Sequence, residues 1–218
     1  MSYQIAIDGP AGAGKSTIAK KVAKEKEFIY VDTGAMYRAM AYYLFSNNVN
    51  PEDAQAVAEK CMEAEITIQY KEGEQVVLLN GKNVNAYLRT EEVGNMASFT
   101  SQNPKVRERL TVLQKDLAAK NNVVMDGRDI GTCVLPGADV KIYLTASAKV
   151  RAKRRFDELT AKGEECDIHK IEKDIIKRDE QDMNRKIAPL KQAEDAVLLD
   201  SSNMTIEEVV HAILTLCR

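Results

Sequence analysis

The chain has 218 residues, of which 44% are hydrophobic and 29% are charged, and its formal net charge is −2. This length suits one domain with a sizeable core and a small insert, rather than two independent domains. No apolar run approaches membrane-spanning length, and the small net charge gives no global field that would attract nucleic acid or a membrane surface. Any anionic ligand must therefore be bound by local clusters of basic residues.

The first residues of the chain bear on its location in the cell, and the cysteines bear on metal binding. The first residues, MSYQIAI, pass directly into a strand-like pattern without the basic and apolar leader of a signal peptide, so we expect a cytoplasmic protein. The four cysteines, at positions 61, 133, 166 and 217, form no Cys-x-x-Cys pair. We therefore expect reduced, structural thiols rather than a zinc site.

Five short β-rich runs alternate with longer helical or mixed segments. They are residues 4–7, 28–31, 122–126, 139–144 and 196–200. Most of these runs are continuously apolar, which is typical of parallel strands with both faces covered. The alternation of strand and helix predicts an α/β fold with a parallel sheet.

Local signals refine this pattern. Asn103-Pro104 predicts a helix cap and first turn, and Thr205 with Glu208 predicts a capping box at the start of the last helix. Residues 66–84, by contrast, alternate apolar and polar positions and contain Glu-Gly and Asn-Gly turn signals. This alternation predicts a small antiparallel β insert.

The most specific motif is GPAGAGKS at residues 9–16, which fits G-x-x-x-x-G-K-[ST] between a strand and a helix that starts near Lys15. Its glycines let backbone N–H groups wrap a polyphosphate, and the helix N-terminus adds partial positive charge. Lys15 would reach the β- and γ-phosphate oxygens, and Ser16 would bind Mg²⁺. We expect ATP to be bound by Gly9, Pro10, Ala11, Gly12, Ala13, Gly14, Lys15, Ser16 and Thr17.

Arginines near the strand ends suggest a second anion site. The D-x-x-G and N-K-x-D patterns of a GTPase switch are absent from the chain, whereas Arg38 and Arg128 follow the second and third β-rich runs. The carboxyl ends of parallel strands share the edge of the sheet at which ligands bind. Each arginine alone could be a surface residue paired with a nearby aspartate, but two at one edge favour a phosphate site.

Two later segments place arginines on helical faces: Arg151, Arg154 and Arg155 in the first, and Arg178 and Arg185 with Asp182 in the second. A solvated helix face with weak i,i+4 pairs is the alternative for each set. Beside a phosphate-binding loop we favour arginines that neutralise a transferred phosphoryl group. A phosphate monoester, with a second pKa of about 6, needs no carboxylate base to act as the acceptor, so this excess of arginines indicates a nucleoside monophosphate kinase.

With these residues assembled, the chain resembles the bacterial cytidylate kinases over essentially its whole length. The similar segments are GPAGAGKST, DTGAMYR, LRTEEVG, NPKVRERL, DGRDIGTCVLP, KRDEQDMNR and VLLDSSNMTIEEV, in this order. DGRDIGT together with RDxxDxNR is the specific combination, because the phosphate-binding loop alone occurs in many families. The resemblance implies a P-loop three-layer α/β/α fold with a five-stranded parallel sheet, a small antiparallel β insert and a short helical lid.

The resemblance also implies the organisation of the chain and the parts its residues play. One kinase domain would span residues 1–218, with a monophosphate-binding region at about 33–100, its β insert at about 63–90 and the lid at about 148–168. The residues implied to bind substrate are Thr33, Arg38, Ser98, Arg107, Arg128, Asp129, Arg178, Asp182 and Arg185. The residues implied to act in catalysis are Lys15, Arg154, Arg155 and Arg185.

Among these, Arg38 and Arg128 would hold the monophosphate, and Asp182 would bind a ribose hydroxyl. Arg178 and Arg185 would reach the phosphate and the ribose when the enzyme closes. Ser98, Arg107 and Asp129 match the positions that read cytosine, whose exocyclic amine donates a hydrogen bond beside ring acceptors.

We therefore predict a monomer that uses Mg²⁺ and transfers the γ-phosphate of ATP to CMP or dCMP, giving ADP and CDP or dCDP, in pyrimidine nucleotide metabolism. A kinase for another nucleoside monophosphate or a small metabolite is the nearer alternative. A switch or scaffold that binds ATP without transferring phosphate is the alternative from a different class. Neither nucleic acid nor a membrane is expected as a partner.

Overall fold

The structure, a computed structural model, describes residues 2–217. It divides into two compact units. Residues 3–28 and 124–217 form one unit, called the loop unit below because it contains the phosphate-binding loop. Residues 29–123, together with Ser2, form the other, called the insert unit because it contains the antiparallel insert.

The main sheet is parallel and has five strands in the order β2-β6-β1-β7-β8. The strands are β1 Gln4–Asp8, β2 Ile29–Asp32, β6 Val123–Gly127, β7 Val140–Thr145 and β8 Val197–Asp200. Each begins within one residue of an expected run, so the prediction of a parallel α/β sheet is confirmed. In the loop unit, β1 pairs with β7 and β7 with β8, and the apolar side chains of β1 and β7 are buried in the core.

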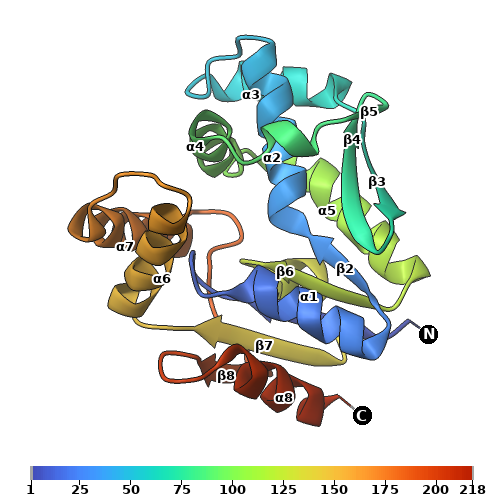
Figure 1. The fold of residues 1–218 in the computed structure, drawn as a ribbon. Helices are drawn as coiled ribbons and strands as arrows, with labels where there is room; N and C mark the ends of the chain where they lie inside the picture. The colour runs from blue at the N-terminus through green and yellow to red at the C-terminus, as the bar shows by residue number, and fades with distance from the viewer. Residues whose placement is uncertain (1, 218) are drawn as a thin grey trace. The chain divides into compact units, whose positions relative to one another are not determined.

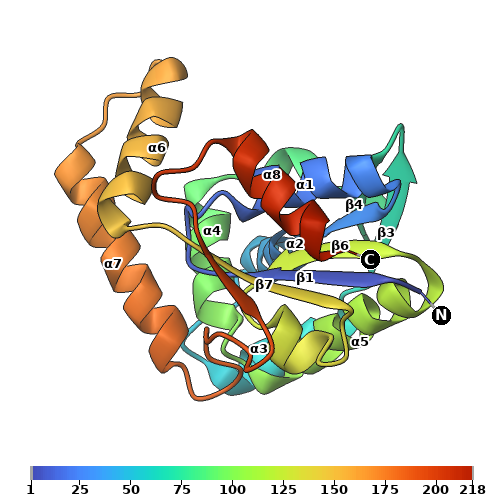
Figure 2. The same cartoon turned by 90° about the horizontal axis from the view of Figure 1, so that it is seen from below.

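Five helical segments complete the loop unit: α1 Lys15–Lys26, η3 Ile130–Val134, α6 Ala148–Ala161, α7 Ile168–Asn184 and α8 Ile206–Leu216. Helices α1 and α8 lie side by side against the sheet (Figure 2), and α6 lies beside α7 (Figure 1). The predicted capping box is present, since Thr205 Oγ1 accepts a hydrogen bond from the Glu208 N–H and the Glu208 carboxylate accepts one from the Thr205 N–H.

The insert unit combines helices with a small sheet. Its elements after β2 are α2 Thr33–Ser46, α3 Ala54–Lys60, η1 Cys61–Glu63, β3 Ile66–Lys71, β4 Glu74–Leu79, β5 Lys82–Asn83, η2 Asn85–Tyr87, α4 Glu91–Thr100 and α5 Pro104–Lys120. Strands β3, β4 and β5 form an antiparallel sheet, as predicted. Asn80 and Gly81 both have positive φ, as a tight hairpin turn requires, and Asn103 caps α5.

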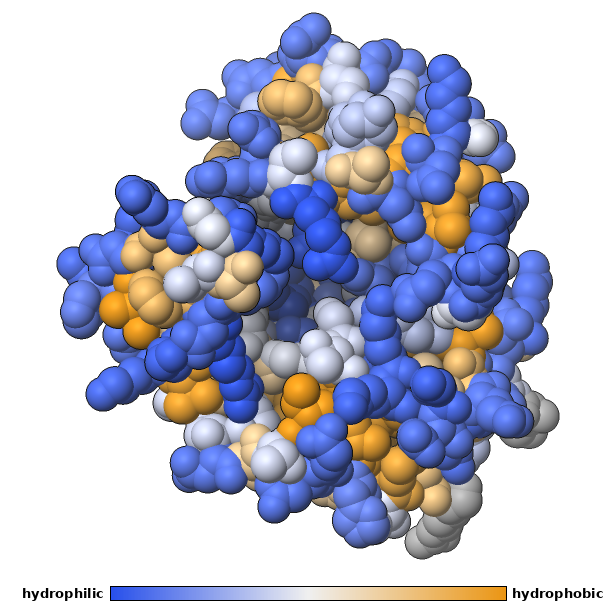
Figure 3. Space-filling model, in the orientation of Figure 1, coloured by the Kyte–Doolittle hydropathy of each residue, from blue (hydrophilic) through white to orange (hydrophobic). Residues whose placement is uncertain are grey.

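The surface agrees with the composition. Figure 3 shows hydrophilic side chains over most of the visible face, with apolar atoms showing around α8, where Ile206 and Leu216 are 43% and 40% exposed. Within residues 2–217 no helix combines the length and the apolar character needed to cross a membrane. Of the cysteines, Cys61 is buried as expected, whereas Cys133 is exposed.

Gly9 lets the phosphate-binding loop begin against the main sheet. Its φ is 150°, and a Cβ atom at this position would lie 1.9 Å from the carbonyl oxygen of Leu144 in β7. Backbone cannot yield as a flexible side chain can, so any larger residue here must push the loop away from β7. This close approach fixes where the loop leaves β1.

We predict that Gly9→Ala lowers the free energy of unfolding by about 3 kcal/mol or more, because the clash and the unfavourable φ act together. Gly137→Ala is the matched control, because a Cβ there meets nothing within 4 Å; we expect a change within about 0.5 kcal/mol. Urea unfolding of both variants measures the difference. Equal stability of the two variants would contradict the packing argument.

Candidate functional site

The phosphate-binding loop turns from β1 into α1 through residues that favour left-handed backbone. Gly12 and Gly14 have φ of 74° and 85°, and Gly14 is the N-cap of α1. Successive residues in such conformations present several backbone N–H groups to one side, which creates an anion-binding concavity. Helix α1 begins at Lys15, so the partial positive charge of the helix N-terminus lies beside the lysine.

Lys15 is buried, and its Nζ donates a hydrogen bond to the carbonyl oxygen of Pro10 at 2.8 Å. Burial and, to a smaller extent, the positive charge of Arg128 together lower the pKa of Lys15 to about 7, although Asp126 and other nearby carboxylates oppose the shift. An anion bound at the loop would favour the charged lysine. The pKa of Lys15 therefore reports whether this site is occupied.

Ser16 and Asp126 bring together two kinds of oxygen that Mg²⁺ prefers. The Ser16 hydroxyl donates to Asp126 Oδ2 at 2.9 Å, and Asp126 is buried at the end of β6. A hydroxyl and a carboxylate at the edge of a polyphosphate site fit a magnesium ion. Sequence reasoning singled out Ser16 but not Asp126, although an acidic residue at a strand end within DGRD was a usable signal.

Four of the expected substrate residues form three ion pairs in the loop unit, one of which joins Arg185 Nη1 to Asp182 Oδ1 at 3.7 Å. Arg128 Nε donates to Asp182 Oδ2 at 2.8 Å, and Arg185 Nη2 lies 3.4 Å from Asp129 Oδ1. Arg185 and Asp129 are buried, so neither charge is strongly screened by solvent. The pairs hold two guanidinium groups in fixed places and connect the segment after β6 to the end of α7.

The predicted helical stripe of Arg178, Asp182 and Arg185 is wrong at its last member. Helix α7 ends at Asn184, and Arg185 has extended backbone with ψ of 141°. Beyond the helix, Arg185 Nε donates a hydrogen bond to the carbonyl oxygen of Ala188, three residues further along the chain. The turn directs Arg185 to Asp129 instead of along the helix face.

The three arginines of α6 do not share one environment, although they were expected on one face. Arg151 is buried, and it donates to the carbonyl oxygens of Ala11 in the loop and Ala146 after β7, each at 2.8 Å. Its Nη2 also lies 2.6 Å from the carboxylate of Asp179 in α7. Arg151 therefore ties α6 and α7 to the phosphate-binding loop.

The other two lid arginines make separate contacts. Arg154 Nη2 donates to the carbonyl oxygen of Ser201 at 2.7 Å, and Arg154 Nη1 lies 4.0 Å from where a Cβ on Gly14 would be. Arg155 is exposed and pairs with Glu158 at 2.9 Å, three residues along the same helix. Arg154 is thus close to the loop. Arg155 instead forms a weak, exposed ion pair along its own helix, which is the alternative expected from the sequence for this set of arginines.

In the insert unit, the segment after β2 places Thr33 and Arg38 on α2. The Asp32 side chain caps this helix by accepting a hydrogen bond from the Ala35 N–H at 2.9 Å, and Thr33 is buried. A Cβ on Gly34 would lie 3.3 Å from Arg38 Nη1 and 3.2 Å from Asp32 Oδ1. The absence of a side chain at Gly34 leaves room for the Arg38 guanidinium near the N-terminus of α2.

Arg107 lies on α5 in the same unit and is held by an aromatic ring. Its Cζ atom is 5.5 Å from the ring centre of Tyr37, and Nη1 donates to the carbonyl oxygen of Ser101 at 3.3 Å. Ser98 is half-buried on α4. The sequence predicted Arg107 and Ser98 but not Tyr37, because a cation–π contact between α2 and α5 has no local signal.

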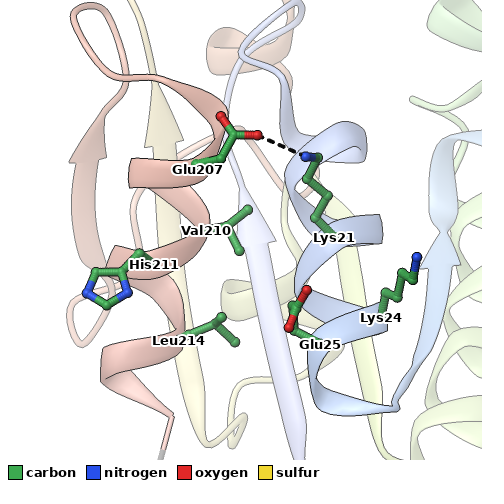
Figure 4. Close-up of a pocket in the computed structure, with 7 residues that line it drawn as sticks. All are labelled: Lys21, Lys24, Glu25, Glu207, Val210, His211 and Leu214. Atoms are coloured by element: carbon green, nitrogen blue, oxygen red, sulfur yellow. Dashed lines mark hydrogen bonds and ion pairs between the residues drawn. The ribbon is translucent and has the colours of Figure 1, made fainter.

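A separate groove of about 330 Å³ lies between α1 and α8 (Figure 4). It is lined by Lys21, Lys24, Glu25, Glu207, Val210, His211 and Leu214. None of these is an expected site residue. The charges are of both signs, and Lys21 is paired with Glu207 at 3.1 Å, so the groove has no excess positive charge to offer a phosphate.

We predict that Asp179→Ala lowers the free energy of unfolding by about 3–5 kcal/mol, because it leaves the buried Arg151 guanidinium without its carboxylate. Asp157→Ala, which removes the exposed partner of Lys153 from α6, is the matched control, and we expect a change of no more than about 1 kcal/mol. Chemical denaturation of both variants tests this. Similar losses in the two would show that burial of the Arg151 pair carries no special weight.

Comparison with known proteins identifies the family of the chain. The family model described as cytidylate kinase matches residues 5–218. The cytidylate kinase of Caldicellulosiruptor bescii is 49% identical over 212 residues, covering 97% of this chain and 94% of the relative. That of Carboxydothermus hydrogenoformans is 48% identical over 211 residues, covering 97% and 95%.

Solved structures support the fold. A shikimate kinase from Bacteroides thetaiotaomicron aligns with a TM-score of 0.50 and 14% identity, covering 98% of this chain and 97% of that one. An uncharacterized protein from Eubacterium ventriosum aligns with a TM-score of 0.52 and 14% identity, covering 99% and 97%. The match along the sequence and the shared P-loop kinase fold lead to one assignment: the chain belongs to the cytidylate kinase family.

Proposed function

We propose that this protein transfers the γ-phosphate of ATP to CMP and dCMP in a reaction that requires Mg²⁺, giving ADP and CDP or dCDP. Membership of the family and the names of the relatives support the reaction. The observation that carries it is the arrangement in the loop unit, where the buried Lys15 of the phosphate-binding loop is close enough to Arg128 and Asp182 to be affected by their charges, and where Arg128 pairs with Asp182 and Arg185 with Asp129. Lys15 and the loop suit a donor polyphosphate, and the arginines suit an acceptor phosphate.

On the donor side, the backbone of the loop would bind the β- and γ-phosphates of ATP. Lys15 Nζ, now bonded to the Pro10 carbonyl, would turn to the phosphate oxygens. Ser16 and Asp126 are the residues that would hold Mg²⁺, directly or through water. A bound Mg²⁺ would neutralise part of the charge that develops on the phosphates.

On the acceptor side, Arg128 would bind the phosphate of CMP and Asp182 a ribose hydroxyl. The ion pair between them supports this, since it holds both groups before substrate arrives and so reduces the ordering cost. Arg178 and Arg185 would add contacts to phosphate and ribose. The same proposal assigns to CMP four residues of the insert unit: Thr33, Arg38, Ser98 and Arg107.

Recognition of cytosine would depend on Asp129. A carboxylate accepts a hydrogen bond from the exocyclic amine at N4, while donors such as Arg107 and Ser98 suit the acceptors N3 and O2. Uracil presents O4 and N3–H at these places, so Asp129 would face an acceptor. Arg185 lies beside Asp129, and a carboxylate in its ionised form can only accept hydrogen bonds.

The chemical step needs positioning and charge neutralisation more than a base. The acceptor phosphate is a dianion near pH 7, so its oxygen can attack directly. Arg154 and Arg155 of α6 would contact the transferred phosphoryl group, with Arg154 first leaving its bond to Ser201. Closure of α6 and α7 would exclude water, which otherwise competes as the acceptor. We further propose that the protein acts as a cytoplasmic monomer.

We predict that CMP is phosphorylated faster than UMP, AMP or GMP at equal concentrations, as measured by ADP release with Mg²⁺ and ATP. Asp129→Ala should reduce the preference for CMP over UMP, expressed as the ratio of kcat/KM values, by about tenfold to a hundredfold, which corresponds to about 1–3 kcal/mol for one base-edge contact. Asp195→Ala is the control, since it also removes the partner of a buried cation, Lys141. An unchanged CMP/UMP ratio in Asp129→Ala would exclude this contact with cytosine.

ATP binding should take up close to one proton per site near pH 8 and far less near pH 6. The pKa of Lys15 is lowered to about 7, so most free protein carries a neutral Lys15 near pH 8. The bound polyphosphate raises this pKa and restores the charge. Titration calorimetry in buffers of different ionisation enthalpy measures the uptake.

Lys15→Arg is the control for proton uptake, because a guanidinium remains charged throughout this pH range. We expect the variant to bind ATP near pH 8 without taking up the proton. The same uptake in the variant and the unmodified protein would mean that another group titrates and that Lys15 does not face the phosphates.

A further inference from the structure

Asp8 is a buried carboxylate to which the proposed reaction gives no part. It is the last residue of β1, directly before Gly9 of the phosphate-binding loop, and it is 4% exposed. Asp8 Oδ1 accepts a hydrogen bond from the Ile130 N–H at 2.8 Å, and Oδ2 accepts one from the Gly131 N–H at 2.7 Å. Both donors belong to the first turn of η3, so each oxygen of Asp8 holds a backbone group far away in the sequence.

The turn held by Asp8 begins immediately after Arg128 and Asp129. These two residues lie between β6 and η3, and the Asp129 carbonyl oxygen accepts hydrogen bonds from the N–H groups of Cys133 and Val134, so the placement of η3 also places Asp129. Asp129 is the N-cap of η3 but makes no side-chain cap bond. The carboxylate of Asp8 substitutes for that missing cap, because it satisfies N–H groups at the start of the turn.

The contact also explains why residue 131 is glycine. A Cβ on Gly131 would lie 3.4 Å from Asp8 Oδ2 and 3.2 Å from Lys141 Cδ. The approach to Asp8 Oδ2 is van der Waals contact and that to the Lys141 side chain is tighter, so a methyl group at Gly131 would fill the space beside the Asp8 carboxylate and press on Lys141. Asp8 and Gly131 therefore share one contact between the end of β1 and the first turn of η3.

The charge on Asp8 is maintained against burial. Burial, with a smaller effect of the negative charge of Asp129, raises the pKa of Asp8 to about 6. The two backbone N–H groups and the ammonium of Lys15 oppose this rise. The group is therefore still ionised at neutral pH. Since the folded-state pKa lies above the ordinary value, ionisation of Asp8 lowers the stability as the pH rises from about 4 to about 6, and the loss is constant above that.

We propose that Asp8 is a positioning residue. By binding the turn that follows Arg128 and Asp129, it fixes these two residues relative to the start of the phosphate-binding loop, and so it aligns the acceptor with the donor. This inference rests on the proposed function. Asp8 itself touches neither substrate: both of its oxygens are engaged by the backbone, and the dianionic acceptor needs no base. Its effect on the reaction passes through the placement of the two substrate residues.

Asp8→Asn tests this with little change in volume. One oxygen would still accept a hydrogen bond, but the new amide group would face a backbone N–H, donor against donor. We expect kcat/KM for CMP to fall by about tenfold to a hundredfold, as small misplacements of a bound substrate do. The loss should appear in KM for CMP and in a smaller CMP/UMP preference, with the dissociation constant for ATP changed by less than about twofold.

Asp139→Asn is the matched control. Asp139 Oδ2 accepts a hydrogen bond from the Gln4 N–H at 2.8 Å, so the same chemical change is made at the opposite end of β1. We expect the control to keep the CMP and ATP parameters of the unmodified protein. Gly131→Ala disturbs the Asp8 contact from the other side and should reproduce the selective loss for CMP, which keeps the proposal testable if Asp8→Asn does not fold.

The double variant Asp8→Asn/Gly131→Ala should lose little more than the worse single variant, because both changes break one contact. Equal losses for CMP and ATP, unchanged CMP parameters in the single variants, or fully additive losses would each overturn the positioning role. Failure of the unmodified protein to phosphorylate CMP would instead overturn the proposed function. The two failures are therefore distinguishable.

Discussion

Charge buried at the carboxyl ends of β1 and β6 is the constraint on which the loop unit depends. Lys15, Asp8 and Asp126 are all buried there, and each would be costly in isolation because a low-dielectric interior penalises an unpaired charge. They are tolerated because backbone N–H groups, the Ser16 hydroxyl and opposite charges surround them. A polyphosphate would complete this balance, since the buried lysine loses much of its charge without an anion.

The same constraint extends to the helices beyond the loop. Arg151 joins the Ala11 carbonyl to Asp179, so α6 and α7 are connected to the loop through a buried ion pair rather than through surface contacts. The segment after β6 and the end of α7 are also connected, because Arg128 pairs with Asp182 of α7 and Arg185 pairs with Asp129. Arg128 and Arg185 thus share Asp182 in one group of ion pairs, in which neighbouring hydrogen bonds reinforce one another.

Local signals in the sequence predicted the strands, the caps of α5 and α8, the turns of the insert and the loop, because each depends on residues close together in the chain. The bonds of Ser16 to Asp126 and of Asp8 to η3 were not predicted, since they join residues more than a hundred positions apart. The stripe through Arg185 was wrong because helical spacing contains no information about where a helix ends. Periodicity likewise could not tell the buried Arg151 from the exposed Arg155.

We propose that the buried charge cluster serves a triphosphate donor and a cytosine nucleotide acceptor together. Thermal melting with a panel of nucleoside monophosphates, with and without a nonhydrolysable ATP analogue and Mg²⁺, tests it most directly, because a ligand raises Tm only if it binds the folded protein. We expect the analogue alone to raise Tm, CMP to raise it more than UMP, AMP or GMP, and the pair to raise it most. Stabilisation by the analogue, with CMP no better than the other monophosphates, would contradict the claim.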